Sequence, residues 1–323
     1  MTTFIAPGGQ RTELPGSCII EGGTLVLPGG YIDEGYLVIE QGRITAVSAN
    51  RPGGSERFHC IDARGAYVAP GLVDVHIHGC GEYSFDSIDP SGFDGAIDFL
   101  ASRGVTTFCP TVQPDETVLR SLAAILTAGG RTNAVSQTVP GLYLEGPFVH
   151  PEKRGGILPD FLRPPDSSYL EHLLRLGRGY LSMMTLAPEL HGAEALLTTC
   201  AREGIRPCFG HSTSSTAAAA DLARSFLANE AGLPLGITHL FNGMSPISHK
   251  QSGLAALPFL YREPYVELNG DRLHVNDEML QLCYSYLNHD RLMLISDAVV
   301  SAGLHTDLPA DLPAGRSAHR EFA

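Results

Sequence analysis

Short apolar runs alternate with longer segments of helical periodicity along the chain from Val68 onward. Apolar runs bounded by Gly, Pro and polar residues are typical of buried strands, and the amphipathic segments between most of them are typical of crossover helices. The predicted strands span residues 68–75, 105–109, 139–145, 180–186, 206–210, 236–240, 264–269 and 291–296. The predicted helices span residues 91–103, 114–128, 168–176, 191–203, 214–229 and 276–288. Eight strands with helical crossovers over about 230 residues predict an α/β fold, a (β/α)8 TIM-like barrel, with a doubly wound sheet as the alternative.

The segment before Val68 follows a different pattern. Short apolar runs such as CII, TLVL, YLVI and ITAV are separated by EGG, PGG and QGR, which are hairpin signals. We therefore expect residues 1–67 to form a small β-rich domain, a partial β-sandwich, and residues 68–305 to form the barrel. Residues 306–323, which are rich in Pro and Ala, predict an irregular tail.

Composition narrows the class of protein. With 43% hydrophobic and 18% charged residues, the 323-residue chain can bury a large core. A formal charge of −13 argues against a nucleic-acid partner and against an anionic membrane surface. The seven cysteines are scattered and form no C-x-x-C pair, which indicates reduced thiols in a cytoplasmic protein. The N-terminus lacks a signal-peptide pattern, and no apolar run approaches the roughly 20 residues of a membrane span.

Polar residues that can bind a metal lie where predicted strands end. They are His76, His78, Glu145, His211, His239 and Asp297. In a barrel, the carboxyl ends of all strands meet at one face, where active sites lie. His76 and His78 are two positions apart, so on a strand their side chains point to the same side. Each residue alone is more simply a structural capping residue, but several histidines with one or two carboxylates form the ligand set of a divalent-metal site.

Such a site suits the hydrolysis of an amide. A divalent ion lowers the pKa of water from about 15.7 towards 7 and polarises a carbonyl oxygen. A carboxylate beside that water can take its proton and pass it to a leaving amine, and we expect Asp297 to do so. Glu145 suits a ligand, one that could bridge two ions. The chain has no G-x-S-x-G, no P-loop and no strand-linked G-x-G-x-x-G motif, so no competing chemistry has comparable support.

The order of the motifs adds a family resemblance. PGLVDVHIHG, LEGPF, GHS, THLFNGMSP, the LHV after Asp271, and SDAV resemble those of N-acetylglucosamine-6-phosphate deacetylases of the amidohydrolase superfamily, over about residues 17–305. The opening His-x-His is common to many amidohydrolases, whereas LEGPF with THLFNGMSP is much more specific.

The resemblance implies a role for each matching position. It implies Glu145, His211 and His239 as main metal ligands and His76 with His78 as the pair for a second metal, the ions being one or two divalent metals such as zinc or iron. It also implies that Asp297 is the general base and acid. Its implied substrate-binding positions are Asn242 and the backbone of Gly243 for the sugar phosphate, and His274.

The chain departs from the family pattern at three places. Ile157 stands where members usually have a histidine, and it cannot hydrogen-bond a substrate; losing such a donor typically costs about 10²–10³ in rate. Lys250 replaces an arginine, which keeps a charge for phosphate but not a bidentate fork, and in the family that residue can act across a homodimer. Members also usually continue further, adding a helix and strands, so we expect apolar strand faces to be exposed.

These observations predict a metal-dependent hydrolase that converts N-acetylglucosamine 6-phosphate to glucosamine 6-phosphate and acetate. Two alternatives stay open from sequence. One is an amidohydrolase for another amide or cyclic amide, because of Ile157 and the Lys250 run. The other is a catalytically impaired, truncated homologue.

Overall fold

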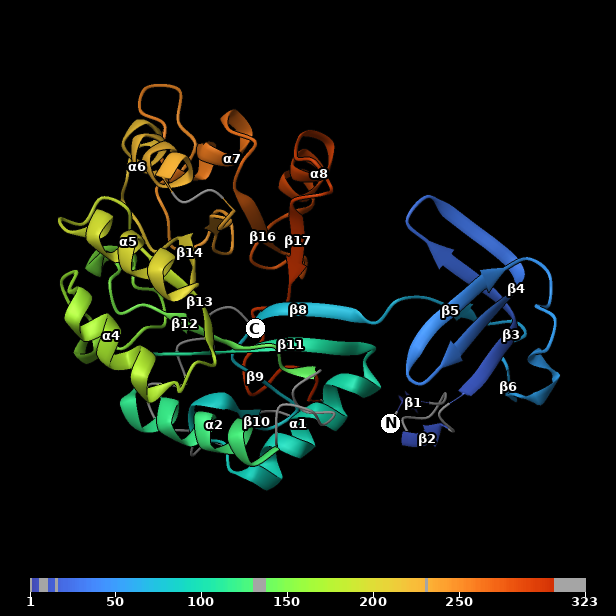
Figure 1. Ribbon diagram of the computed structural model, residues 1–323. Helices are drawn as coiled ribbons and strands as arrows, with labels where there is room; N and C mark the ends of the chain where they lie inside the picture. The colour runs from blue at the N-terminus through green and yellow to red at the C-terminus, as the bar shows by residue number, and fades with distance from the viewer. Residues whose placement is uncertain (1, 6–10, 15–16, 130–137, 230–231, 305–323) are drawn as a thin grey trace. The chain divides into compact units, whose positions relative to one another are not determined.

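The computed structural model describes residues 2–5, 11–14, 17–129, 138–229 and 232–304 (Figure 1). The predicted tail, 306–323, lies outside these residues. The chain divides into two compact units, residues 1–73 with 98–106 and residues 74–97 with 107–323. The boundary expected after residue 67 stays a prediction. No helix in the described part of the chain has the length and apolar character needed to cross a bilayer.

The first unit is β-rich, as its hairpin signals predict. Its strands are β1 (Thr2–Ile5), β2 (Arg11–Leu14), β3 (Ser17–Leu27), β4 (Gly30–Glu40), β5 (Arg43–Ser48), β6 (His59–Asp62) and β7 (Tyr67–Val68), with a 3-10 helix η1 (Ser55–Arg57) in the polar loop. The main sheet has the order β5-β4-β3-β6, and β7 pairs with β3, while β1 and β2 form a separate hairpin. Cys18, Ile19 and Leu25 are buried, but Ile44 of β5 is 62% exposed, in line with the expected uncovered apolar face.

The second sheet carries the candidate chemistry. Its strands are β8 (Leu72–Ile77), β11 (Val105–Val112), β12 (Leu142–Glu145), β13 (Leu181–Leu186), β14 (Arg206–Phe209), β15 (Gly236–Ile237), β16 (Tyr265–Asn269) and β17 (Leu292–Ile295). Neighbours in this eight-stranded sheet follow chain order from β8 to β17. An order without reversal is that of a barrel, so the (β/α)8 prediction is confirmed and the doubly wound alternative is wrong.

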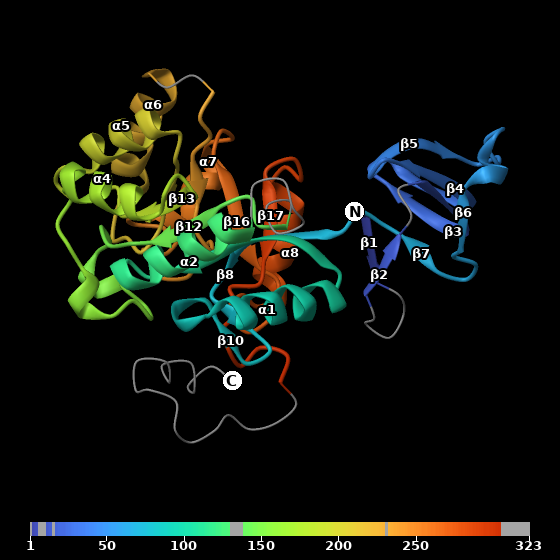
Figure 2. The ribbon, with the colours of Figure 1, turned by 60° about the horizontal axis from the view of Figure 1, so that its bottom comes forward.

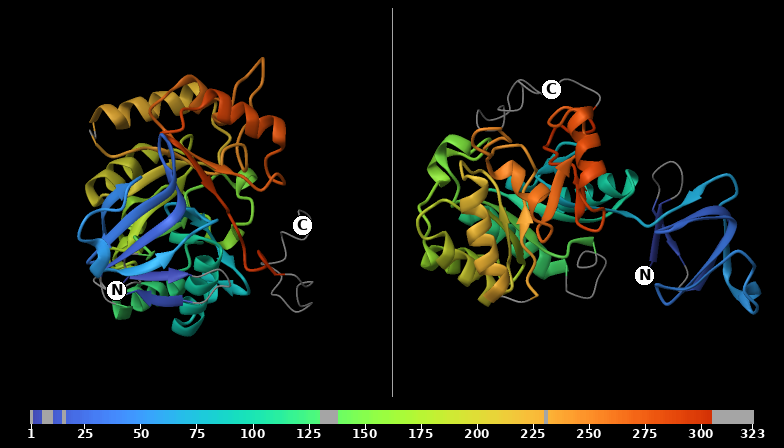
Figure 3. Two further views of the ribbon diagram at one scale, coloured as in Figure 1. Left: turned by 90° about the vertical axis from the view of Figure 1, so that its right-hand side faces the viewer. Right: turned by 90° about the horizontal axis from the view of Figure 1, so that it is seen from above.

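Helices cover the outside of this sheet. They are α1 (Pro90–Ser102), α2 (Glu116–Gly129), α4 (Ser167–Leu176), α5 (Ala193–Glu203), α6 (Thr216–Asn229), α7 (Leu257–Leu260) and α8 (Asp277–Tyr286). The short elements are β9 (Gly79–Cys80), β10 (Tyr83–Ser84), η2 (Phe85–Ser87), η3 (Pro151–Lys153), η4 (Pro159–Phe161) and η5 (Leu254–Ala256). Figures 1 and 2 show α4, α5 and α6 side by side outside β12 to β14, and Figure 3 shows them from above. Asp166 begins α4 by accepting hydrogen bonds from the N–H groups of Ser168 and Tyr169.

The barrel closes between its first strand and the segment after its last. The Asp297 N–H donates to the His76 carbonyl at 2.9 Å, and the Ser296 N–H donates to the buried Asp74 carboxylate at 3.2 Å. Asp74 also accepts from the His76 N–H at 3.3 Å, so one carboxylate joins both sides of the closure. This closure places Asp297 next to His76.

The strand predicted at 68–75 is in fact two strands. Tyr67–Val68 pairs with β3, and β8 begins only at Leu72. Pro70 lies between them and has no N–H to donate to a ladder, which explains the break. Leu72 on β8 is 61% exposed and Leu294 on β17 is 64% exposed, so an apolar side chain is exposed on the first and on the last strand of the sheet.

Packing of the barrel unit can be tested at Phe108. Its ring stacks on Phe85 at a centroid distance of 5.6 Å, and both side chains are fully buried. Phe108→Ala should lower the free energy of unfolding by about 3–5 kcal/mol in urea titrations, because it leaves a cavity. Tyr286→Ala, at a side chain that is 75% exposed, is the control and should change it by no more than about 0.5 kcal/mol. Equal effects of the two substitutions would contradict this packing.

Candidate metal centre

Six side chains meet at the carboxyl ends of the barrel strands. They are His76, His78, Glu145, His211, His239 and Asp297, all of which were candidates from sequence. Glu145 is the last residue of β12, whereas His211 and Asp297 each follow their strand by two positions. Two overlapping groups of these residues have ligand atoms close enough to hold an ion: His76, His78 and Glu145, and Glu145, His211 and His239.

The Glu145 carboxylate is common to both groups. Its Oε1 lies 2.9 Å from His211 Nε2, 3.2 Å from His239 Nε2 and 3.6 Å from His76 Nε2. Its Oε2 lies 3.4 Å from His78 Nε2. One buried carboxylate therefore faces four imidazoles, which is the arrangement that the sequence predicts for a bridging ligand.

Asp297 lies beside the His76–His78 pair. Its Oδ1 is 3.5 Å from Nε2 of each of these histidines. His76 lies on β8 and His78 directly follows the end of that strand, and their ring centroids are 5.4 Å apart. The Asp297 side chain is 18% exposed, whereas His76 is fully buried, so Asp297 is accessible from solvent.

Backbone strain occurs at the same residues. His211, His239 and Asp297 have φ values of +47°, +28° and +49°, in the left-handed region that side chains other than glycine avoid. Each such residue costs about 1–3 kcal/mol and is retained only where its surroundings fix it. Around His211, the Glu189 carboxylate does so by accepting hydrogen bonds from Ser212 Oγ at 2.7 Å and from the Thr213 N–H at 2.6 Å.

The imidazoles are arranged to accept a cation. His211 Nδ1 donates to the Lys153 carbonyl at 2.6 Å, so in the neutral ring the lone pair is on Nε2, the nitrogen that faces Glu145 at 2.9 Å. That atom lies 3.0 Å from His239 Nε2. Two nitrogens bound to one tetrahedral zinc at about 2.05 Å would lie about 3.3 Å apart, close to the separation here. Within the described residues, His76 Nε2 is buried with no hydrogen-bond partner, which also suits a metal ligand. The residues present therefore fit a divalent metal.

The histidines and carboxylates of the centre shift one another's pKa values. Burial alone would lower the pKa of His78 and of His239, but the hydrogen bonds and charge of Glu145, with the charge of Asp297, raise each pKa to about 9. Burial would raise the pKa of Glu145, but the adjacent histidines hold it well below its usual range. The pKa of Asp297 is also lowered: burial opposes this, and the charges of His76, His239 and His78 outweigh it. The centre is therefore a place where cationic charge is stabilised.

The substrate-binding candidates lie at different places around this centre. Asn242 is half-buried, and its Nδ2 donates to Asn269 Oδ1 at 3.4 Å. Gly243 has φ +56°, and an added Cβ would lie 3.0 Å from His211 Nδ1, so glycine is needed there. Lys250 is exposed on the same loop. His274 instead pairs with Asp271 at 2.5 Å.

Ile157 is buried at 1% exposure. Its Cδ1 lies 3.6 Å from the position that a Cβ on Gly146 would take, directly after Glu145 in the chain. The departure from the family pattern therefore places an apolar side chain beside the centre, in agreement with the expectation that this position offers no hydrogen bond.

Two residues of β16 belong to the surroundings of the centre and were missed from sequence. Glu267 and Asn269 are both fully buried. Glu267 Oε2 lies 2.9 Å from His76 Nδ1, and Asn269 Nδ2 donates to Asp297 Oδ2 at 3.4 Å. The available signal was their spacing of two within the apolar run YVELN, which places both on one side of the strand.

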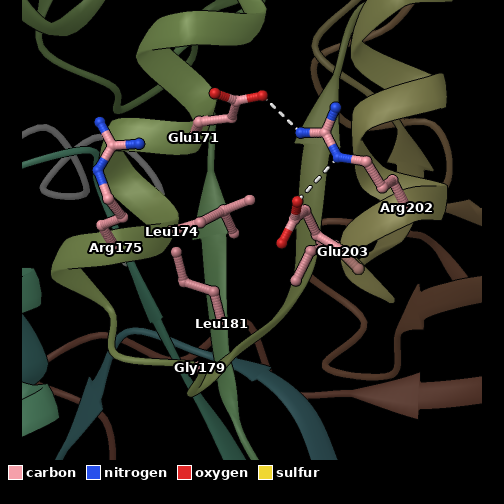
Figure 4. A pocket seen from close by; sticks show the side chains of 8 residues that line it. Glu171, Leu174, Arg175, Gly179, Leu181, Arg202 and Glu203 are labelled. Atoms are coloured by element: carbon pink, nitrogen blue, oxygen red, sulfur yellow. Dashed lines mark hydrogen bonds and ion pairs between the residues drawn. The ribbon is translucent and has the colours of Figure 1, made fainter.

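A separate cavity lies at the other end of the barrel. It has a volume of about 410 Å³ and is lined by Glu171, Leu174, Arg175, Gly179, Leu181, Arg202, Glu203 and Ile205. Figure 4 shows Arg202 paired with both Glu171 and Glu203, at 2.5 and 2.9 Å. Leu181 begins β13, so this cavity is at the amino-terminal face, away from the strand ends where barrel enzymes react.

Comparison with known proteins places the chain in a family. It is 30% identical over 317 residues to the N-acetylglucosamine-6-phosphate deacetylase of Mus musculus, covering 93% of this chain and 72% of the relative. The chain belongs to the N-acetylglucosamine-6-phosphate deacetylase family. The deacetylase of the same name from Bacillus subtilis is 27% identical over 296 residues, covering 89% of this chain and 72% of the relative.

Two further matches bear on substrate and fold. The N-acetylgalactosamine-6-phosphate deacetylase of Escherichia coli O157:H7 is 28% identical, covering 85% of this chain and 70% of the relative. A solved variant of the deacetylase from Mycobacterium smegmatis, in complex with N-acetyl-D-glucosamine-6-phosphate, has a TM-score of 0.78 and 26% identity, covering 90% of this chain and 73% of that one. No family model matches the chain.

The raised histidine pKa values predict proton release on metal binding. Below about pH 6.5, His78 and His239 are protonated in both folded and unfolded chains; from there to about pH 9 only the folded, metal-free chain keeps these protons. The metal-free protein should therefore lose stability as pH rises from 6.5 through 9. Because a ligating imidazole must be neutral, Zn²⁺ binding at pH 7.5 should release about two protons, with affinity rising towards pH 9.

Calorimetric titration in buffers with different protonation enthalpies measures this release. His289→Gln, at an exposed histidine, is the control and should leave the release unchanged. A metal that binds without releasing protons between pH 7 and 8 would show that these histidines are already neutral.

Proposed function

We propose that this chain removes acetate from N-acetylglucosamine 6-phosphate in a metal-dependent hydrolysis, leaving glucosamine 6-phosphate. The observation that carries the proposal is the shared Glu145 carboxylate, which faces four imidazoles at the strand ends with the partly exposed Asp297 beside them. Relatives named for this reaction span most of the chain, which supports the choice of substrate.

We assign the metal ligands by geometry and charge. Glu145, His211 and His239 would hold the first ion, and His76 with His78 would hold a second beside the same carboxylate. Zinc or iron suits this set of nitrogen and oxygen donors. When bound, such an ion supplies Lewis acidity, which makes water a better nucleophile at neutral pH and polarises a carbonyl.

Asp297 would move the proton. Its lowered pKa keeps the carboxylate ionised at neutral pH, ready to accept a proton from the attacking water. The water oxygen bonds to the acetamide carbon, and Asp297 then delivers the proton to the nitrogen as the C–N bond breaks. Acetate and the free amine leave. The hydrogen bond from Asn269 to Oδ2 leaves Oδ1 on the side of His76 and His78.

The sugar phosphate would bind on the loop that follows β15. Asn242, the backbone of Gly243 and the exposed Lys250 supply an amide, an N–H group and a positive charge for the phosphate. His274 would contact the sugar. Lys250 would reach the site of a second copy in a homodimer. Seven unpaired cysteines, six of them buried, support a reducing, cytoplasmic location.

A second candidate substrate is N-acetylgalactosamine 6-phosphate, which differs at one sugar carbon. It is favoured by the 28% identity to the Escherichia coli deacetylase named for that sugar. The acetamide chemistry at Asp297 and Glu145 would be the same for both, so only the sugar contacts decide between them. Comparison of kcat/KM for the two sugar phosphates separates the candidates.

Asp297→Asn tests the reaction directly. It should lower kcat for acetate release by about 10²–10⁴, because it removes the proton carrier, while the ions bound per chain stay unchanged. Asp290→Asn is the matched control at an exposed aspartate and should keep full activity. Full turnover in Asp297→Asn would refute the assigned base.

The wild-type protein in the same assay separates the remaining alternatives. Acetate should appear from the 6-phosphate and much more slowly from unphosphorylated N-acetylglucosamine. Turnover of a different N-acyl or cyclic amide alone would favour another amidohydrolase activity. Metal-loaded protein that binds the sugar phosphate without ever releasing acetate would favour an impaired homologue.

A further inference from the structure

A buried acid on β16 touches the metal centre without being one of its ligands. Glu267 is fully buried. Its Oε2 lies 2.9 Å from His76 Nδ1 and accepts a hydrogen bond from the His239 N–H at 3.4 Å, and its Oε1 lies 3.9 Å from Cys208 Sγ. The contact with His76 joins residues 191 positions apart in the chain.

We propose that Glu267 is a positioning residue that prepares His76 to bind the second ion. A carboxylate can only accept, so His76 Nδ1 carries a proton, and in the neutral ring that binds a metal the lone pair is then on Nε2. Carboxylates that hold the far nitrogen of a metal-binding histidine in this way fix its ring and make it a stronger ligand. The inference rests on the proposed function, since it concerns the same metal centre.

The other nitrogen of His76 is free for this purpose. Among the described residues, His76 Nε2 has no hydrogen-bond partner although its side chain is completely buried. The nearest carboxylate oxygens, on Asp297 and Glu145, lie at 3.5 and 3.6 Å, too far for a good hydrogen bond. A buried, unpaired nitrogen is costly, and a cation bound by His76 beside the Glu145 carboxylate would satisfy this nitrogen.

A purely structural role would make a different prediction. If Glu267 only joined β16 to β8, its loss would lower the free energy of unfolding. The folded molecules that remain would then bind both ions with unchanged affinity. If Glu267 prepares His76, its loss weakens the second ion selectively. The first ion has its own side-chain support, since His211 Nδ1 donates to the Lys153 carbonyl at 2.6 Å, and Glu267 contacts the other imidazole ligand, His239, only at its backbone N–H, at 3.4 Å.

The experiment measures zinc binding by the metal-free full chain, with mass spectrometry for ions per chain and competition titration for each Kd. The wild type should bind two ions. Glu267→Gln keeps an acceptor but loses the charge and should weaken the second ion about 10-fold; Glu267→Leu loses both and should weaken it about 100-fold. Thr185→Val is the control, because it removes a buried barrel hydroxyl bonded to Tyr143 and Thr238, and it should leave both ions in place.

Nitrogen-15 spectra of the metal-free protein add a second readout. The wild type should show His76 with its proton on Nδ1, and Glu267→Leu should shift the ring towards the other tautomer. This measurement is decisive on the wild type alone, so it does not depend on whether a variant folds. A His76 ring with its proton on Nε2 and none on Nδ1 would overturn the inference.

The results separate this inference from the proposed function. Two ions of unchanged affinity in both Glu267 variants, or a single ion in the wild type, would overturn the role of Glu267 while leaving the first ion and the hydrolysis intact. A wild type that binds no zinc or iron would contradict the proposed function itself, whatever the variants do.

Discussion

A single buried carboxylate, Glu145, sets the constraint on which the rest of the centre depends. An ionised group of this kind is stable away from water only when opposite charge and hydrogen bonds surround it. Here the neighbouring imidazoles hold the pKa of Glu145 low, and in return Glu145 raises the pKa of His78 and His239 to about 9. Protons satisfy this demand in the metal-free chain, and one or two divalent ions would satisfy it in the enzyme that we propose.

The barrel makes this convergence possible. Parallel strands in chain order bring the carboxyl ends of distant segments to one face, and the hydrogen bond from Asp297 N–H to the His76 carbonyl fixes the last strand end against the first. The strained φ values of His211, His239 and Asp297 show that the loops leave the strands sharply in order to aim these side chains. Fold and site are therefore coupled most tightly at the closure, where Asp74 bonds to both sides.

Sequence predicted the barrel because its apolar runs and amphipathic segments alternate regularly, and it found the centre because polar residues at strand ends stand out against apolar runs. Glu267 was missed because a single acidic residue inside an apolar strand gives no local signal of a functional site. Its contact is with His76, which is far away in the chain. The start of β8 was misplaced because an apolar pattern continues across Pro70, where the pairing changes from one sheet to the other. The buried position of Ile157 likewise depends on packing that no local pattern encodes.

The most direct measurement of the central claim is a crystal structure of zinc-loaded protein with diffraction data on both sides of the zinc absorption edge. We predict a strong anomalous peak between Glu145 Oε1 and the Nε2 atoms of His211 and His239, with a second near His76 and His78. An empty centre in zinc-loaded crystals, or zinc bound only elsewhere on the chain, would contradict the assignment of Glu145 as the shared ligand.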